Sequence, residues 1–293
     1  MRGRLTVLLV VLAFAAPALA DGPATPNPES ALPGLANVPG RPHPVPHCRH
    51  ASLKCIDGLI ARLTKQWHVL DAMCDHRAVF SLAYLRITQG LKKAILAGQL
   101  QDPHWMEYVI TDFSNHYLGY FAAAARGNPV PYSWQVAYDE DRSGDANAGQ
   151  DTLLASNAHT QHDLPYIYFE MGIGTADGTS RKHDHDVVNA INDSVFRGLE
   201  DYYAAHYDPI MGDFELAPLG LDRIGVLSVI QGWRELAWRN AERLAAAKTY
   251  EDRLAVEEEI DANADMWADM IRSGDQQGYR ATRDAFCAAH RGS

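Results

Sequence analysis

The sequence has no long apolar run after its first twenty residues, and it has no cluster of Lys or Arg. A membrane-spanning helix needs about 20 consecutive apolar residues, so we expect no later segment to cross a bilayer. Acidic residues outnumber basic ones by 37 to 26, and the formal net charge is −11. This balance argues against nucleic acid or an anionic membrane surface as the main partner.

Several catalytic signatures are also absent. The sequence contains no Gly-x-Ser-x-Gly elbow, Walker loop, His-Glu-x-x-His motif, haem-attachment motif or dinucleotide fingerprint. These absences argue against serine hydrolases, NTPases, zincins, c-type cytochromes and Rossmann dehydrogenases. The alternating apolar patterns and Asn-Gly turns that are typical of strands are scarce as well, so no substantial sheet is expected.

Residues 1–20 have the features of a signal peptide. Two arginines precede an apolar segment over residues 5–16, and small residues up to Ala20 match a cleavage site. We therefore expect an exported protein, periplasmic or extracellular after cleavage near Ala20. Residues 21–50 are rich in Pro and Ala and predict an extended arm, and residues 51–293 are expected to form the helical domain.

The four cysteines are an even number, which in an oxidising compartment favours disulfides over free thiols. An apolar stripe over residues 52–70 predicts a helix with Cys55 and Cys74 at its opposite ends, about 28 Å apart at a rise of 1.5 Å per residue. A disulfide joins Cα atoms within about 7 Å, so these two cannot pair. We predict the pairs Cys48–Cys55 and Cys74–Cys287, and the second would attach the last helix to the first.

Apolar residues recur with a helical period through almost all of the chain after residue 50. Asp75, Asp102 and Asp184 are each expected to cap the start of a helix, and Leu164-Pro165 is expected to end one. We therefore predict an all-α fold, a single compact domain of about nine helices with no substantial sheet. The expected helices cover residues 52–70, 75–98, 102–127, 134–138, 150–163, 184–207, 219–248, 251–271 and 276–290, with a polar loop at 139–149.

The segment over residues 157–165 holds the strongest candidate for chemistry. His159 and Asp163 lie four residues apart, so in a helix both side chains project from one face. In one interpretation Asp163 accepts a hydrogen bond from His159 and fixes the packing of the helix. In the other, imidazole and carboxylate bind a divalent metal, zinc or manganese. A second His/Asp cluster over residues 183–186 offers Asp184 to complete such a site between two helices.

A set of motifs spread over residues 50–245 resembles a known family. The motifs are Phe80, Tyr84 and Thr88 within residues 75–98, Asp102-Pro103-x-Trp105, Phe113, Tyr117, Pro131-x-x-Trp134-x-x-Ala137, Asn157-Ala-His159-x-x-x-Asp163-Leu-Pro165, Asp184-x-x-x-x-Asn189 and Trp238-x-x-Ala241. The family is an uncharacterised bacterial helical family catalogued as domain of unknown function 5995. It has no established activity, so the resemblance implies no reaction. It directs attention to Asn157, His159, Asp163, Asp184 and Asn189.

Two functions are compatible with these residues. The first is a metal-dependent hydrolase of a small ester or phosphoester outside the cytoplasm, in which His159, Asp163 and Asp184 hold a divalent metal. The second is a non-catalytic exported helical protein that binds a small molecule or another protein, in which the His/Asp/Asn cluster is a structural hydrogen-bond network. The residues expected to orient or bind substrate in the first are Asn157, Asn189, Arg234 and Arg239.

Overall fold

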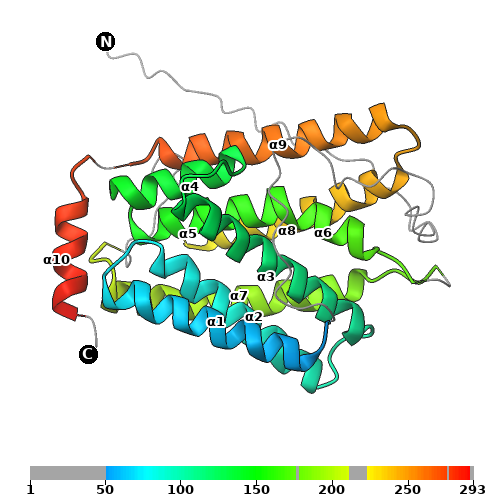
Figure 1. Ribbon diagram of the computed structural model, residues 1–293, viewed down its shortest axis with the longest axis horizontal. Helices are drawn as coiled ribbons and strands as arrows, with labels where there is room; N and C mark the ends of the chain where they lie inside the picture. Colours follow the sequence, from blue (N-terminus) through cyan, green and yellow to red (C-terminus); the bar gives the residue numbers. More distant parts are fainter. Residues whose placement is uncertain (1–50, 176–177, 211–222, 276, 291–293) are drawn as a thin grey trace, which may run out of the picture.

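Figure 1 shows the computed structural model of the chain, which describes residues 51–175, 178–210, 223–275 and 277–290. The described residues form helices and one isolated β-bridge, between Gly174 and Ser180, and no strand. The predicted all-α fold is therefore confirmed. The elements are α1 (Leu53–Ala72), α2 (Ala78–Leu96), α3 (Pro103–Ala125), α4 (Tyr132–Ser143), α5 (Ala148–Asn157), the π-helix η3 (Ala158–Asp163), α6 (Leu164–Met171), α7 (Lys182–His206), α8 (Arg223–Ala246), α9 (Tyr250–Arg272) and α10 (Arg280–His290).

The expected signal peptide, the arm over residues 21–50 and Cys48 lie outside the described residues, so these parts of the interpretation stay predictions. Within the described ranges, no helix combines the length and the apolar composition that crossing a membrane requires.

Local signals explain where several helices begin. Asp102 precedes α3 as predicted, and its side chain accepts a hydrogen bond from the backbone N–H of Trp105 (2.9 Å). Ser52 caps α1 in the same way through the N–H of Cys55 (3.2 Å). At the start of α5, Asn147 and the side chain three residues later satisfy each other's backbone N–H groups, which is a capping box.

Two of the predicted caps are wrong. α2 begins three residues after Asp75, whose carboxylate binds the guanidinium group of Arg77 (2.6 and 2.8 Å). α7 begins two residues before Asp184, so this residue lies inside the first turn. The carboxylate of Asp184 accepts the backbone N–H groups of Gln101 and Asp102 (2.7 and 2.8 Å). Asp184 therefore fastens α7 to the start of α3.

The polar segment over residues 139–149 is not a loop throughout, contrary to the prediction. α4 continues to Ser143 and ends at Gly144, whose φ of 75° lies in the left-handed region that glycine adopts without steric cost. α5 begins only four residues later, at Ala148. The connection is therefore short. The helical turns on either side of it were not predicted because α4 and α5 carry many polar side chains there.

Leu164-Pro165 does not end a helix as predicted. The chain runs from α5 through η3 directly into α6, and the N–H of Leu164 donates to the carbonyl of His159, five residues earlier. Proline has no N–H, and in a regular α-helix its ring clashes with the carbonyl four residues before it, here that of Gln161. The wider π turn lies immediately before Pro165. His159 and Asp163 therefore belong to a π-helix. Such helices are rare in proteins overall, but those that occur are often found at functional sites.

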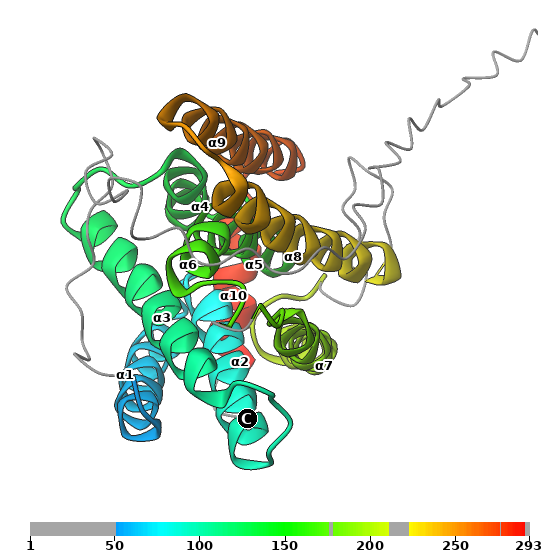
Figure 2. The ribbon, with the colours of Figure 1, turned by 90° about the vertical axis from the view of Figure 1, so that its right-hand side faces the viewer.

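The segment α5–η3–α6 forms the centre of the molecule. Every residue of α5 is buried, and the segment contacts α2, α3, α4, α8 and α9. Figures 1 and 2 show α9 along one side of the molecule and α1 on the opposite side, and in Figure 1 α10 crosses one end. Polar residues of α5 find buried partners, as they must in a dry environment. Asp151, for example, pairs with Arg283 of α10.

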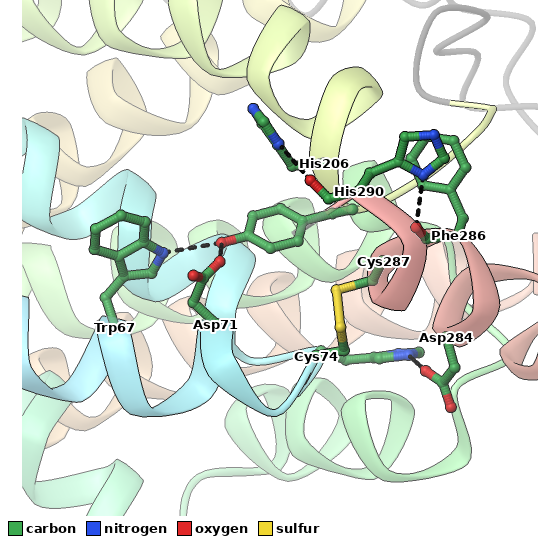
Figure 3. Close-up of a disulfide and its surroundings, with 10 residues drawn as sticks. Trp67, Asp71, Cys74, His206, Asp284, Phe286, Cys287 and His290 are labelled. Atoms are coloured by element: carbon green, nitrogen blue, oxygen red, sulfur yellow. Dashed lines mark hydrogen bonds and ion pairs between the residues drawn. A yellow bond between two sulfur atoms is a disulfide. The ribbon is translucent and has the colours of Figure 1, made fainter. Parts of the chain in front are cut away.

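The predicted disulfide between Cys74 and Cys287 is confirmed. Figure 3 shows it joining the turn after α1 to α10, with Cα atoms 5.9 Å apart. Beside it, the hydroxyl of Tyr207 accepts a hydrogen bond from Trp67 Nε1 (3.0 Å) and donates one to Asp71 (2.5 Å). The cysteines of the described part of the chain include no free thiol. The pairing of Cys55 with Cys48 stays a prediction, because Cys48 is outside that part.

Candidate functional site

The carboxylate of Asp163 is the centre of a buried hydrogen-bond network. Its Oδ2 lies 2.9 Å from His159 Nδ1 and 3.0 Å from Trp134 Nε1, and its Oδ1 lies 2.6 Å from His162 Nδ1. Burial alone would raise the pKa of Asp163, but the hydrogen bonds from His159 and His162 lower it well below its usual value. Asp163 is therefore ionised at neutral pH and accepts hydrogen bonds from all three ring N–H groups.

This network fixes the protonation state of His159. Burial lowers the pKa of His159 to about 4, against the opposing effect of the hydrogen bond to Asp163, so the imidazole is neutral at pH 7. Because an ionised carboxylate can only accept, the single ring proton of His159 must be on Nδ1. The ring stacks on Phe113, with centroids 3.4 Å apart and planes within 5°. The other nitrogen, Nε2, is left with a lone pair and no partner.

His159 lines a cavity of about 40 Å³ among α2, α3, α5, η3, α6, α7 and α8. Most of its wall is apolar, and most of the lining side chains are buried. Apolar residues that line it include Phe80, Ile87, Met106, Val109, Val188 and Ile230. Asp163 and Trp134 are not part of the wall, so His159 lies between the network, which it contacts through Nδ1, and the cavity.

Four polar side chains of the cavity wall have a buried atom without a hydrogen-bond partner. They are Ser156 Oγ, His159 Nε2, Asn192 Oδ1 and Arg234 Nη1, from α5, η3, α7 and α8. Such atoms are uncommon inside folded proteins, because each has lost its contact with water without gaining another partner. Four of them on the wall of one small cavity mark it as the place where a polar molecule, or ordered water, completes the structure.

Arg234 is held rigidly at the wall. Its Nε donates to Asn189 Oδ1 (2.7 Å) and its Nη2 to Asp193 Oδ1 (2.6 Å), and only 2% of the residue is exposed. Asp193 balances the guanidinium charge, so the cavity contains no unpaired net charge. Arg234 and Asn189 were both expected at a substrate, and the structure places Arg234 on the cavity wall with Asn189 bonded to its Nε.

The other expected site residues lie elsewhere. Asn157 is fully buried and ties α5 to α9, with Nδ2 donating to the carbonyl of Ala264 (2.7 Å) and Oδ1 accepting from Gln161 (2.6 Å). Both ends of this amide are therefore occupied. Arg239 has a side chain that is 54% exposed and pairs with Glu242 on the same helix. Neither residue lines the cavity.

The structure does not bring His159, Asp163 and Asp184 together as a metal site. Among the described residues, the group of three His or acidic side chains whose ligand atoms lie within 4.8 Å of one another is His185, Asp186 and Glu235. Asp163 and Asp184 instead use both carboxylate oxygens for N–H donors. The structure therefore does not gather the three expected ligands, and metal binding itself stays a prediction.

The His185–Asp186–Glu235 group is a poor cation site. The ammonium group of Lys182 lies 2.5 Å from Asp186 and 2.9 Å from Glu235, so a cation already pairs with both carboxylates. His185 uses Nδ1 for the hydroxyl of Tyr168 (3.0 Å) and Nε2 for Glu235 (3.3 Å). The hydrogen bond from His185 lowers the pKa of Glu235 to about 2. These residues make a complete ion-pair network without a metal.

Comparison with known protein families identifies one match. The chain belongs to the Family of unknown function (DUF5995), whose model matches residues 56–274. The resemblance noted in the sequence is therefore confirmed. No curated protein and no solved structure matches the chain. The family provides no activity, so a function has to be argued from the cavity itself.

Two cavity residues, Ser156 and Asn192, are not among the site residues that the sequence analysis selected. Ser156 lies three residues before His159, a spacing that places two helical side chains side by side. Asn192 belongs to the run of Asn and Asp residues on α7 that also supplies Asn189 and Asp193. Helical spacing therefore held a signal for both residues. What it did not show is that α2, α3 and α8 enclose them around a common space.

Proposed function

We propose that this protein is an exported helical protein that binds a small, neutral molecule in the cavity beside His159. The observation that carries the proposal is the set of unpartnered polar atoms on one otherwise apolar wall. An apolar wall with a few convergent polar groups is the usual form of a small-molecule site. This is the second of the two functions that the sequence allowed, with the His159–Asp163 pair as part of a hydrogen-bond network.

The energetic argument is that these atoms need a partner. Leaving one buried polar group unbonded costs about 1–3 kcal/mol, so four cost roughly 4–12 kcal/mol. The net stability of a folded domain is only about 5–15 kcal/mol. A cavity of about 40 Å³ has room for about three waters, or for a few non-hydrogen atoms of a ligand.

The hydrogen-bonding character of the wall defines the ligand. His159 Nε2 and Asn192 Oδ1 can only accept, Arg234 Nη1 can only donate, and Ser156 Oγ can do either. A matching molecule needs O–H or N–H groups and one acceptor. A carboxylate has no donor for His159 or Asn192, and the charge of Arg234 is already balanced by Asp193. The wall therefore favours a small alcohol or primary amide over the corresponding carboxylate.

Thermal shift with propionamide and propionate tests this preference, because the two probes have nearly the same shape. A ligand at 100 times its Kd raises the free energy of unfolding by about 2.7 kcal/mol. We expect propionamide to raise Tm and propionate to have no effect. Asn192→Leu should abolish the shift, whereas Arg239→Leu, which also replaces a polar side chain by leucine but on an exposed residue outside the wall, should preserve it.

The proposal fails if two results are found together. The first is that neither propionamide nor 1-propanol shifts Tm. The second is that crystals grown with either probe show ordered waters bonded to the four unpartnered atoms of the wall. It also fails if propionate binds as well as propionamide, because the donor and acceptor pattern of the wall would then not select the ligand.

A further inference from the structure

We propose that a second cavity, at the end of the molecule that α10 crosses (Figure 1), binds a small organic amine through Asp141 of α4. No residue lines both this cavity and the one beside His159. The inference therefore does not depend on the proposed function, and it adds a ligand that carries a positive charge.

The second cavity has a volume of about 680 Å³, which is in the usual range for a small-molecule pocket. It lies among the turn between α1 and α2, the end of α3, α4 and α10. Figure 3 shows two residues of its wall, Cys74 of the disulfide and Asp284 of α10. Three alanines of the wall, Ala124, Ala125 and Ala288, have small side chains and leave space between the charged ones.

Each arginine of the wall already has an acidic partner. The pairs are Arg77–Asp75 (2.6 Å), Arg142–Asp139 and Arg280–Asp284 (3.3 Å). Burial lowers the pKa of His76, the histidine of the wall, so its ring is neutral at pH 7 and adds no charge. The positive charges of the wall are therefore balanced without Asp141.

Asp141 is the acidic residue of the wall that lacks a counter-charge. In the described part of the chain, its carboxylate takes part in no hydrogen bond or ion pair. Burial raises the pKa of this carboxyl well above its usual value, and the negative charges of Asp151 and Asp75 raise it further. Arg283 and Arg77 oppose this effect only in part. The ionised form of Asp141 therefore has a cost in free energy that a bound cation would remove.

A second unsatisfied group lies beside Asp141 on the same face of α4. Tyr138 precedes Asp141 by three residues, a spacing that places two helical side chains side by side, and both residues line the cavity. Only 5% of Tyr138 is exposed, and its hydroxyl has no hydrogen-bond partner. Burial raises the pKa of this hydroxyl, and the charge of Asp141 adds to the effect, so the hydroxyl is neutral. α4 thus offers a carboxylate and a neutral oxygen to the N–H groups of a ligand.

These groups fit an ammonium better than a metal ion or an anion. A divalent metal ion takes several oxygen ligands at once, and the group of three close ligands found among the described residues lies elsewhere, around His185 and Glu235. An anion would meet arginines that are already paired and a carboxylate that repels it. An ammonium group has three N–H donors and one positive charge, and the alanines of the wall can contact its carbon chain.

Isothermal titration calorimetry with cyclohexylamine, which is protonated at pH 7, tests the site. We expect saturable binding to wild type and none of cyclohexanol, which has the same ring without the charge. Both molecules are too large for the cavity of about 40 Å³ beside His159. Asp141→Asn should weaken the binding about tenfold, because a hydrogen bond to a charged group becomes a neutral one. Tyr138→Phe, which removes the unpartnered hydroxyl, should weaken it several-fold.

Asp201→Asn is the matched control, because it makes the same substitution on an exposed carboxylate of α7 outside the cavity wall. It should leave the affinity for cyclohexylamine unchanged. Asp141→Asn removes a charge that has no partner, so we expect the Tm of this variant without ligand to be at least that of wild type. Weaker binding by Asp141→Asn is then separated from unfolding.

Three results of the titration would overturn the proposal. They are equal affinity of wild type and Asp141→Asn, equal binding of cyclohexanol and cyclohexylamine, and no binding of cyclohexylamine at millimolar concentrations. A lower Tm of Asp141→Asn without ligand would also contradict it, because the carboxylate would then have a partner that stabilises the fold. None of these results concerns propionamide in the cavity beside His159, so the two proposals can fail separately.

Discussion

Replacing Asp163 by Asn tests the buried network directly. The change keeps the shape of the side chain and removes its charge. The wild-type carboxylate accepts three ring N–H groups, from Trp134, His159 and His162. A hydrogen bond to a charged group contributes about 1.5–3 kcal/mol and a neutral one about 0.5–1.5 kcal/mol. The amide nitrogen of Asn cannot accept, so at least one of the three bonds is lost and the others become neutral. We expect Asp163→Asn to lower the free energy of unfolding by about 3–5 kcal/mol at pH 7.

Desolvation does not cancel this loss. The pKa of Asp163 is lowered although burial alone would raise it, so the hydrogen bonds outweigh the cost of burying the charge. A group with a lowered pKa stabilises the folded state above its unfolded pKa of about 3.9, and this contribution is lost as the pH falls below that value. The difference between wild type and Asp163→Asn should therefore shrink in strong acid.

Urea unfolding followed by tryptophan fluorescence measures the effect. The control is Asp261→Asn, the same substitution on a carboxylate that is 50% exposed and 3.5 Å from the same His162. It should change stability by less than about 0.5 kcal/mol. If Asp163→Asn is within about 1 kcal/mol of wild type at pH 7, the carboxylate is not the acceptor that the geometry indicates, and the assignment of the His159 tautomer falls with it.

Three further predictions follow from other contacts. Burial lowers the pKa of His159 to about 4, so between about pH 6.5 and 4 the unfolded chain binds a proton at this residue and the folded chain does not. As the pH falls through that interval, wild type should therefore lose about 3 kcal/mol of stability. If a His159→Gln variant shows the same dependence of unfolding free energy on pH in urea titrations, this reasoning is refuted. A Cβ at Gly90 would lie 2.7 Å from Ile191 of α7, whereas one at Gly58 meets nothing within 4 Å. Gly90→Ala should therefore lower stability by about 1 kcal/mol or more, and Gly58→Ala should raise it by about 0.5–1 kcal/mol. If the two variants unfold at the same urea concentration, the packing of α2 on α7 is not as described. Removing the Cys74–Cys287 bridge in a Cys74→Ala/Cys287→Ala variant should lower stability by about 3–5 kcal/mol, since the bridge closes a separation of 213 residues; a variant as stable as wild type would show that the cross-link does not restrict the unfolded chain.

What the sequence could predict was mostly local. The cap at Asp102 depends on residues within one turn of it, and the disulfide between Cys74 and Cys287 followed from the length of one helix. The hydrogen bond between His159 and Asp163, one of the two interpretations of that pair, also depends only on residues four apart.

The incorrect predictions concern contacts between distant segments and local turns that have no simple sequence pattern. Asp184 looked like a helix cap or a metal ligand because nothing in its neighbourhood shows that the backbone of Gln101 and Asp102 lies against it. Pro165 looked like the end of a helix because a π turn accommodates it, and such turns have no simple pattern of their own. The cavity is the extreme case, since its wall combines side chains of helices that are far apart in the chain.

The distance between Cys55 and Cys74 has a consequence for the order of events during synthesis. Cys74 emerges from the ribosome 213 residues before its partner, and during that time Cys55 is the nearer thiol along the chain. Helices form in microseconds, whereas disulfides need seconds or longer. Once α1 has formed, it holds these two sulfur atoms at opposite ends of a rigid rod. We therefore expect α1 to keep Cys74 from pairing with Cys55, so that Cys74 is still reduced when the segment with Cys287 reaches it.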